Sequence, residues 1–502
     1  MKKFFLLIIV VIIFAPISIR ADVSLLVLEA LGVAGEFTGS GHAAIYLSNI
    51  CTDNGISLRP CRETESGVVI SSYPNFANGS TYEWMAVPLL PYLYGVENPN
   101  EIPIYANGEI RNFLREGYRR THLNPIIPAA PDGTMPEGSW RTMLTAAFNR
   151  DVYGFTVNTT AAEDIQFLRE VSSKANNGKF SSFTNNCADF ARKTINRYFP
   201  GVARRDWIND FGITTPKAVA RSFVSYAKDH PERELSISRF PQIPGPITRS
   251  FDNRNFTETA YKSKKYLIPS LIFKTSLVAI FSGTYLLTGR FNVHKTYVKY
   301  ASPEIARLKR ELNTASNPGL MYFAGNNRRE DIAEKLKRSN EALLGNNDIW
   351  KSHRLTFAPI LKGLVAQGLF RDEKEVKSFF RDLELQSEPA TDQNGGLSLK
   401  VKYYGQDRIL GITRLNLIDE TSDPELALKL IVARIYADLN ANEKDRSLYP
   451  DFRSDWLAMR QLIQDQSAML AAIDKSRGPF ASNPPPISPK RALKKAVIAI
   501  TH

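Results

Sequence analysis

The chain has 502 residues, of which 43% are hydrophobic and 11% aromatic, so it can bury more than one core and is not a disordered protein. Its formal net charge of +13 favours contact with anionic surfaces, such as membrane headgroups or acidic cell-envelope polymers. The basic residues are scattered among acidic ones, without an arginine stripe or an RNA-binding motif. This pattern argues against nucleic acid as a partner.

Residues 1–21 have the pattern of a secretory signal peptide. Lys2 and Lys3 precede an apolar run from Phe4 to Phe14, and the small residue Ala21 stands at the expected cleavage point. We therefore expect an exported protein of the periplasm or cell envelope. Because Ile19 is a poor residue at the third position before cleavage, an uncleaved membrane anchor remains an alternative.

Five short apolar segments alternate with loops rich in Gly, Asn, Asp and Pro, and this predicts a largely antiparallel sheet. The expected strands are residues 23–28, 42–47, 67–73, 82–87 and 153–157, and a helix is expected at 109–117. Thr160 and Glu163 form a capping box, which predicts a helix to about residue 175. A second helix is expected from Cys187 to Tyr198.

The rest of the chain is expected to divide into four further parts. Residues 231–262 are rich in Pro, Arg and Ser and predict a linker. Residues 263–290 contain the apolar stretch 266–288, long enough to cross a membrane. Lys274 within it keeps a buried core helix or a membrane-surface hairpin open as alternatives.

Residues 291–475 predict a mostly helical domain, and residues 476–502 a Pro-rich, basic tail. The expected helices are residues 303–315, 329–344, 357–370, 373–385, 424–440 and 455–474, with a hairpin at 397–417.

The chain has three cysteines. Cys51 and Cys61 lie in one loop-like stretch and could pair as a disulfide in an oxidising compartment. A metal site formed by these two cysteines and His42 is an alternative that their spacing disfavours, so we expect neither a metal nor a cofactor. Cys187 is left without a partner, and is either an inert buried thiol or a reactive one.

The surroundings of Cys187 favour the reactive thiol. Asn186 is a good N-cap, so Cys187 stands where unpaired N–H groups and the positive end of a helix dipole converge. This field predicts a thiol with a lowered pKa, and the same N–H groups can stabilise an oxyanion. Asp189, also in the first turn, is expected to have a structural role.

The segments Gly41-His42-Ala43-Ala44-Ile45-Tyr46-Leu47 and Asn186-Cys187-Ala188-Asp189-Phe190 resemble the circularly permuted branch of the papain-like superfamily. This branch includes NlpC-like hydrolases and lecithin retinol acyltransferase-like proteins. The resemblance covers roughly residues 23–200, within a domain expected at 22–230. It implies an antiparallel sheet packed on the cysteine helix, with Cys187 as nucleophile and His42 as its base.

The same resemblance places a polar residue on the strand that follows the histidine strand. Ser71 stands at that position, although serine orients an imidazole less well than His, Asn or Asp. Glu83 and, more distantly, His122 are the alternatives.

These features predict a cell-envelope cysteine hydrolase or acyltransferase that acts on an amide or ester of an acyl- or peptide-containing substrate through a thioester. A membrane or an envelope polymer is the expected partner. One alternative is a catalytically degenerate papain-like module that binds or organises envelope components. Another is a lipid-directed acyltransferase anchored by residues 266–288.

Overall fold

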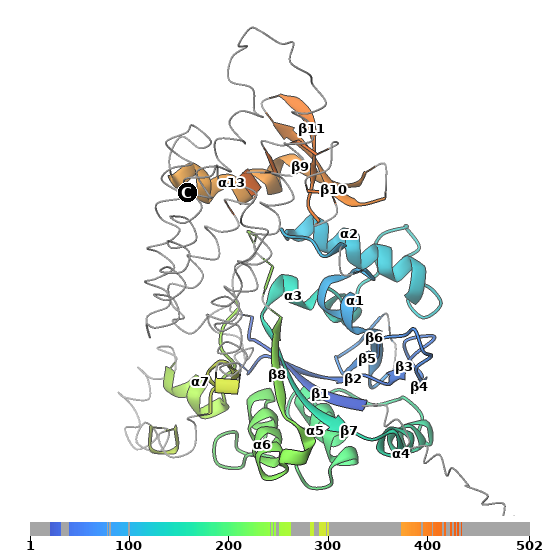
Figure 1. The fold of residues 1–502 in the computed structure, drawn as a ribbon, viewed down its shortest axis with the longest axis vertical. Coiled ribbons are helices and arrows are strands. Elements are labelled where there is room, and N and C mark those ends of the chain that lie inside the picture. Colours follow the sequence, from blue (N-terminus) through green and yellow to red (C-terminus); the bar gives the residue numbers. More distant parts are fainter. Residues whose placement is uncertain are drawn as a thin grey trace, which may run out of the picture.

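A computed structural model describes residues 21–31, 40–262, 282–285, 291–300 and 373–433, with short internal gaps. In these ranges the protein is of the α+β class, as predicted, and is built around a six-stranded antiparallel sheet (Figure 1). The strand order is β6-β5-β2-β1-β7-β8. The strands span Ala21–Leu28 (β1), His42–Leu47 (β2), Val68–Ser71 (β5), Met85–Pro88 (β6), Val152–Thr159 (β7) and Ser236–Phe240 (β8).

Helices cover both faces of this sheet (Figure 1). The apolar run of β1 explains why, because Leu25 and Val27 point into one core while Leu26 and Leu28 point into the other. The first core is closed by α4 (Ala161–Ser172), α5 (Cys187–Tyr198) and α6 (Pro216–Asp229). The second is closed by α1 (Leu89–Tyr94), α2 (Gly108–Tyr118) and α3 (Ala146–Asn149).

Short elements connect these layers. A two-stranded ribbon, β3 (Ile50–Cys51) and β4 (Arg59–Pro60), lies in the loop between β2 and β5. Single turns of π- or 3₁₀-helix follow at η3 (Arg119–Leu123), η4 (Ser139–Met143) and η5 (Pro231–Arg233).

The predicted strands and helices of the first 200 residues are present with shifted ends. The capping box of Thr160 and Glu163 is formed at the start of α4, and α5 begins at Cys187 after the N-cap Asn186. The sequence analysis did not predict α6, although Thr215 caps it and Pro216 occupies its first position.

The structure differs from the expected linker at residues 231–262. This segment contains β8, which pairs with β7 as the last strand of the sheet, and α7 (Phe256–Lys262). Asn253 also donates hydrogen bonds to the carbonyls of Leu28 and Ser40. The Pro and Arg content hid a short strand, because β8 depends on pairing with β7 and not on its own apolar pattern.

A smaller sheet lies against α2 (Figure 1). It consists of β9 (Ser387–Thr391), β10 (Leu397–Tyr403) and β11 (Gln406–Gly411), preceded by α13 (Glu373–Gln386). The Tyr105 hydroxyl donates to the Phe380 carbonyl at 3.2 Å, and the Ile104 N–H donates to Ile412 O at 2.8 Å.

The predicted helix at 373–385 and the predicted hairpin at 397–417 are therefore confirmed. Strand β9 was not predicted, so residues 373–411 of the expected helical domain form one helix and a three-stranded sheet. The helices predicted at 303–315, 329–344, 357–370 and 455–474 lie outside the described residues, as do most of 424–440 and the tail.

Among the described residues, no helix has both the length and the apolar character needed to cross a membrane. The apolar stretch 266–288 lies outside them apart from residues 282–285, as does the expected signal peptide apart from Ala21. Ala21 is fully buried and begins β1, opposite Thr159 of β7.

Candidate active site

The N-terminus of α5 is fixed by its cap. The side chain of Asn186 accepts a hydrogen bond of 2.9 Å from the Asp189 N–H, as its sequence position predicts. Its amide nitrogen donates to the carbonyls of Ser182 and Thr214, each at 3.1 Å. One side chain thus ties the helix start to the two loops beside it and fixes the position of Cys187.

Asp189 serves this scaffold. It is fully buried, and its Oδ1 atom accepts hydrogen bonds from Thr214 Oγ1 at 2.6 Å and from Arg205 Nη2 at 3.0 Å. Arg205 also donates to the Thr184 carbonyl at 3.2 Å. The carboxylate therefore holds the loops around the helix start, in agreement with the structural role expected for it.

Strand β2 lies against the helix that carries Cys187. Helix α5 packs on β2, and the backbone N–H of Ala43 favours the thiolate form of Cys187 and so acts to lower its pKa. The N–H groups of Cys187 and Ala188 interact with the same sulfur. Backbone donors from a strand and from a helix start thus converge on one thiol, and the strand donor belongs to the residue after His42.

His42 and Ser71 are brought together as predicted. The Nε2 atom of His42 lies 2.7 Å from Ser71 Oγ, and both side chains are buried. The ring of Tyr73 stacks on the imidazole with a centroid separation of 4.0 Å. These two contacts fix the ring plane and engage Nε2 with the serine.

The register of the sheet explains this meeting. β2 and β5 pair antiparallel, with Ile45 opposite Ile70, so the start of β2 lies beside the end of β5. Gly41, just before His42, has a φ of 76°. A Cβ atom at Gly41 would lie 2.2 Å from the Leu28 carbonyl and 2.1 Å from the Asn253 amide nitrogen, so only glycine fits this turn.

The electrostatics of the pair differ from the expected low-pKa thiol. Burial raises the pKa of Cys187 above its ordinary value, although the N–H groups and Arg150 act in the opposite direction. Burial, with a smaller effect of Arg150, lowers the pKa of His42 well below its ordinary value. Both shifts favour the neutral forms, a thiol at Cys187 and an imidazole at His42, because desolvation of the charged forms outweighs the helix field.

Glu83 and His122, the two alternatives to Ser71 as the residue that orients His42, have other partners. Glu83 lies beside Lys193 of α5, with the carboxylate and ammonium 3.9 Å apart, and packs on Gly178. His122 pairs with Glu97 at 3.0 Å and packs on the ring of Tyr118. Of the three residues considered, Ser71 is the one hydrogen-bonded to His42.

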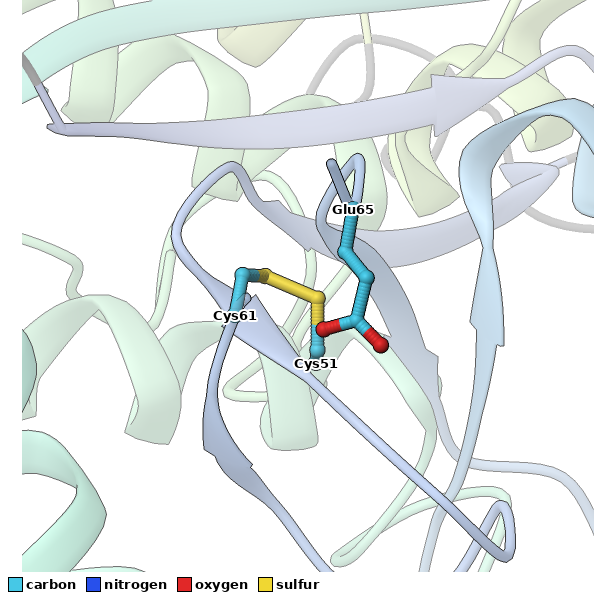
Figure 2. Close-up of side chains that lie close together, drawn as sticks. All are labelled: Cys51, Cys61 and Glu65. Carbon is cyan, nitrogen blue, oxygen red and sulfur yellow. A yellow bond between two sulfur atoms is a disulfide. The ribbon is translucent and has the colours of Figure 1, made fainter. Parts of the chain in front are cut away.

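Cys51 and Cys61 form the predicted disulfide (Figure 2). The Glu65 carboxylate lies close by, with one ligand atom from each of the three residues within 4.8 Å of the others. The bonded sulfurs are not thiolates, and Arg59 and Arg62 neutralise Glu65. The metal alternative is therefore not supported, because its thiolates are absent and His42 bonds to Ser71 elsewhere. By the chain-entropy model, so short a closed loop contributes about 3 kcal/mol to stability.

Two site residues were missed from the sequence. Tyr73 stacks on His42, and Arg150, between α3 and β7, acts electrostatically on both His42 and Cys187. The position of Tyr73 two residues after Ser71 was a usable signal. Arg150 had none, because only the pairing of β1 with β7 brings it to the site.

Ser71 is expected to act as a positioning residue. Ser71→Ala removes one hydrogen bond to a buried ring, so we expect kcat/KM to fall about tenfold on the substrate class that forms the acyl-enzyme. The acid limb of the pH profile should also move, because Nε2 loses its partner. Ser72→Ala is the matched control, and equal losses in the two variants would contradict a role specific to Ser71.

Comparison of the chain with family models, with curated proteins and with solved structures finds no match.

Proposed function

We propose that the domain formed by residues 21–262 is a cysteine hydrolase or acyltransferase of the permuted papain-like kind. Cys187 is the nucleophile, His42 the general base and Ser71 the residue that orients the imidazole. The observation that carries this proposal is the meeting of the histidine strand with the N-terminus of the cysteine helix. This arrangement unites a thiol, a base with a fixed ring and backbone donors.

The neutral state of the pair defines the first step. As the sulfur adds to the carbonyl carbon of an amide or ester, the thiol proton passes to His42 Nδ1 and the carbonyl π electrons move to oxygen. Collapse of this tetrahedral species breaks the bond to the leaving group, which takes the proton from His42. The product is a thioester, and water or another acceptor releases the acyl group with His42 again acting as base.

The oxyanion of the tetrahedral species needs donors that are already in place. We assign this role to the N–H groups at the start of α5 and to that of Ala43, which act electrostatically on the Cys187 sulfur. This chemistry uses side chains and backbone alone and needs no cofactor.

The proposed compartment is the cell envelope. The signal-like N-terminus supports export, and the Cys51–Cys61 disulfide supports an oxidising environment.

A surface beside the site favours a membrane substrate as the second candidate. Phe183, Trp207 and Ile208 are 61%, 71% and 59% exposed, on the two loops that Asn186 ties to α5. The exposed basic residues Lys179 and Arg204 lie on the same loops. Apolar side chains among basic ones suit the surface of an anionic bilayer, and this supports a lipid-directed acyltransferase.

The experiment that tests the function is a search for the acyl-enzyme. The full chain is incubated with anionic phospholipid vesicles or with peptidoglycan fragments, quenched in acid and analysed by intact mass. We expect one substrate class to add an acyl mass at Cys187 that hydroxylamine removes. An adduct formed only from peptidoglycan fragments would contradict the lipid-directed acyltransferase. No adduct from either substrate class would contradict the proposal that the domain is a thiol enzyme.

A further inference from the structure

Arg150 is a buried cation at the end of the sheet where β2 begins with His42. It is 8% exposed and lies two residues before Val152, the first residue of β7. Leu28 pairs with Val152 on one side and with His42 on the other. Arg150 Nη1 donates to the carbonyl of Glu29, the residue after Leu28, at 3.3 Å. The guanidinium is thus fixed at the strand end beside the start of β2.

The guanidinium of Arg150 has an N–H donor that no group of the described residues accepts. Its Nε atom is buried without a hydrogen-bond partner, and among the described residues no carboxylate pairs with Arg150. The acidic residue next to Arg150 in sequence and the one whose carbonyl it contacts are engaged elsewhere: Arg239 pairs with Asp151, and Ser250 and Tyr153 donate to Glu29. A buried guanidinium whose Nε lacks a partner is costly, and a bound anion would satisfy both this donor and the charge.

The charge also opposes the proposed first step. A cation near His42 disfavours the imidazolium that forms when the imidazole accepts the thiol proton. An anion bound to Arg150 would cancel this repulsion. A substrate carrying such an anion would therefore make His42 a better base at the moment of binding.

We propose that Arg150 is a subsite for an oxyanion of the substrate, a carboxylate or a phosphate close to the acyl carbonyl that Cys187 attacks. This inference rests on the proposed function and names its substrate class. A planar guanidinium with free N–H groups is the side chain best suited to bind either oxyanion.

Two alkylating reagents that differ in charge test this subsite. Iodoacetate and iodoacetamide place the same methylene carbon at the sulfur, and both form an S–C bond with loss of iodide and of the thiol proton. We expect Arg150→Gln to lower the ratio of the iodoacetate rate to the iodoacetamide rate at Cys187 at least about tenfold. Arg150→Lys should keep part of the ratio, and Lys193→Gln, which removes an exposed charge from α5, should leave it unchanged. An unchanged ratio in Arg150→Gln would overturn the proposal even when iodoacetamide reacts normally.

A second measurement does not depend on the thiol. In the Cys187→Ala protein, phosphate or acetate should raise the Tm above that in sodium chloride of equal ionic strength. The more effective anion distinguishes a phosphate from a carboxylate. Arg150→Gln introduced into the same protein should reduce the difference to the general stabilisation that these excluded salts give any folded protein. An equal rise in Tm with and without Arg150 would overturn the subsite and leave the proposed nucleophile untouched.

Discussion

Replacing Cys187 with alanine is expected to abolish acyl transfer, with a loss of about a millionfold in kcat. The sulfur forms the bond to the acyl group, and an alanine methyl group at the start of α5 cannot replace it. The measurement is turnover of the substrate class that gives the acyl-enzyme, with the mass adduct followed in parallel. The fold should persist, because the helix cap depends on Asn186 and not on the thiol.

Cys187→Ser is the informative companion variant. It keeps a hydroxyl in the same place, and its activity should also be nearly lost, because a serine hydroxyl is far less acidic than a thiol. Normal turnover in Cys187→Ala would exclude the thiol mechanism. An unimpaired envelope function in that variant would favour the degenerate binding module.

The central fold and site were predictable because local signals mark them. Asn186 before Cys187 identifies a helix start, and the glycines before His42 identify a tight turn into a strand. Ser71 was a candidate because the family resemblance places a polar residue on the strand after the histidine strand, and the sheet register brings it to the imidazole. These residues lie at element ends, where the sequence carries capping and turn information.

Other features depend on long-range pairing and leave no local pattern. Strand β8 exists through its ladder with β7, and Arg150 reaches the site because β7 is paired with β1. The pKa of Cys187 was expected to be low from the helix start alone. Desolvation by the surrounding structure instead raises this pKa. The degree of burial depends on the whole fold and cannot be inferred from the motif around Cys187.

The neutral resting pair predicts a distinctive pH dependence of thiol reactivity. Iodoacetamide alkylation of Cys187 requires the thiolate, so its rate should rise with pH through an apparent pKa above the ordinary cysteine value. A preformed thiolate–imidazolium pair would instead give a rate plateau that extends into the acidic range. A plateau of that kind, lost in His42→Gln, would show that the expectation of a neutral pair is wrong.

Catalysis should depend on His42, and its acid limit should lie at low pH, whereas thiol alkylation becomes fast only at high pH. His42→Gln removes the base, and we expect kcat/KM to fall about 10⁴-fold at neutral pH. In the wild type the imidazole remains a base into mildly acidic solution, because its pKa is lowered. The acid limb of kcat/KM should therefore lie below the pH range of an ordinary histidine.

The same lowered pKa makes a prediction about stability that needs no substrate. Below a pH of about 6.5 the unfolded chain protonates His42, whereas the folded protein still holds it neutral. Unfolding then takes up one proton at this site, so the free energy of unfolding falls by about 1.4 kcal/mol per pH unit as the pH drops towards the folded-state pKa. His42→Gln cannot take up this proton on unfolding. Its free energy of unfolding, measured in denaturant at several pH values, should therefore have a pH slope smaller than that of the wild type by about 1.4 kcal/mol per pH unit. Parallel curves for the two proteins would mean that His42 has an ordinary pKa in the folded state, and the desolvated neutral pair would have to be abandoned.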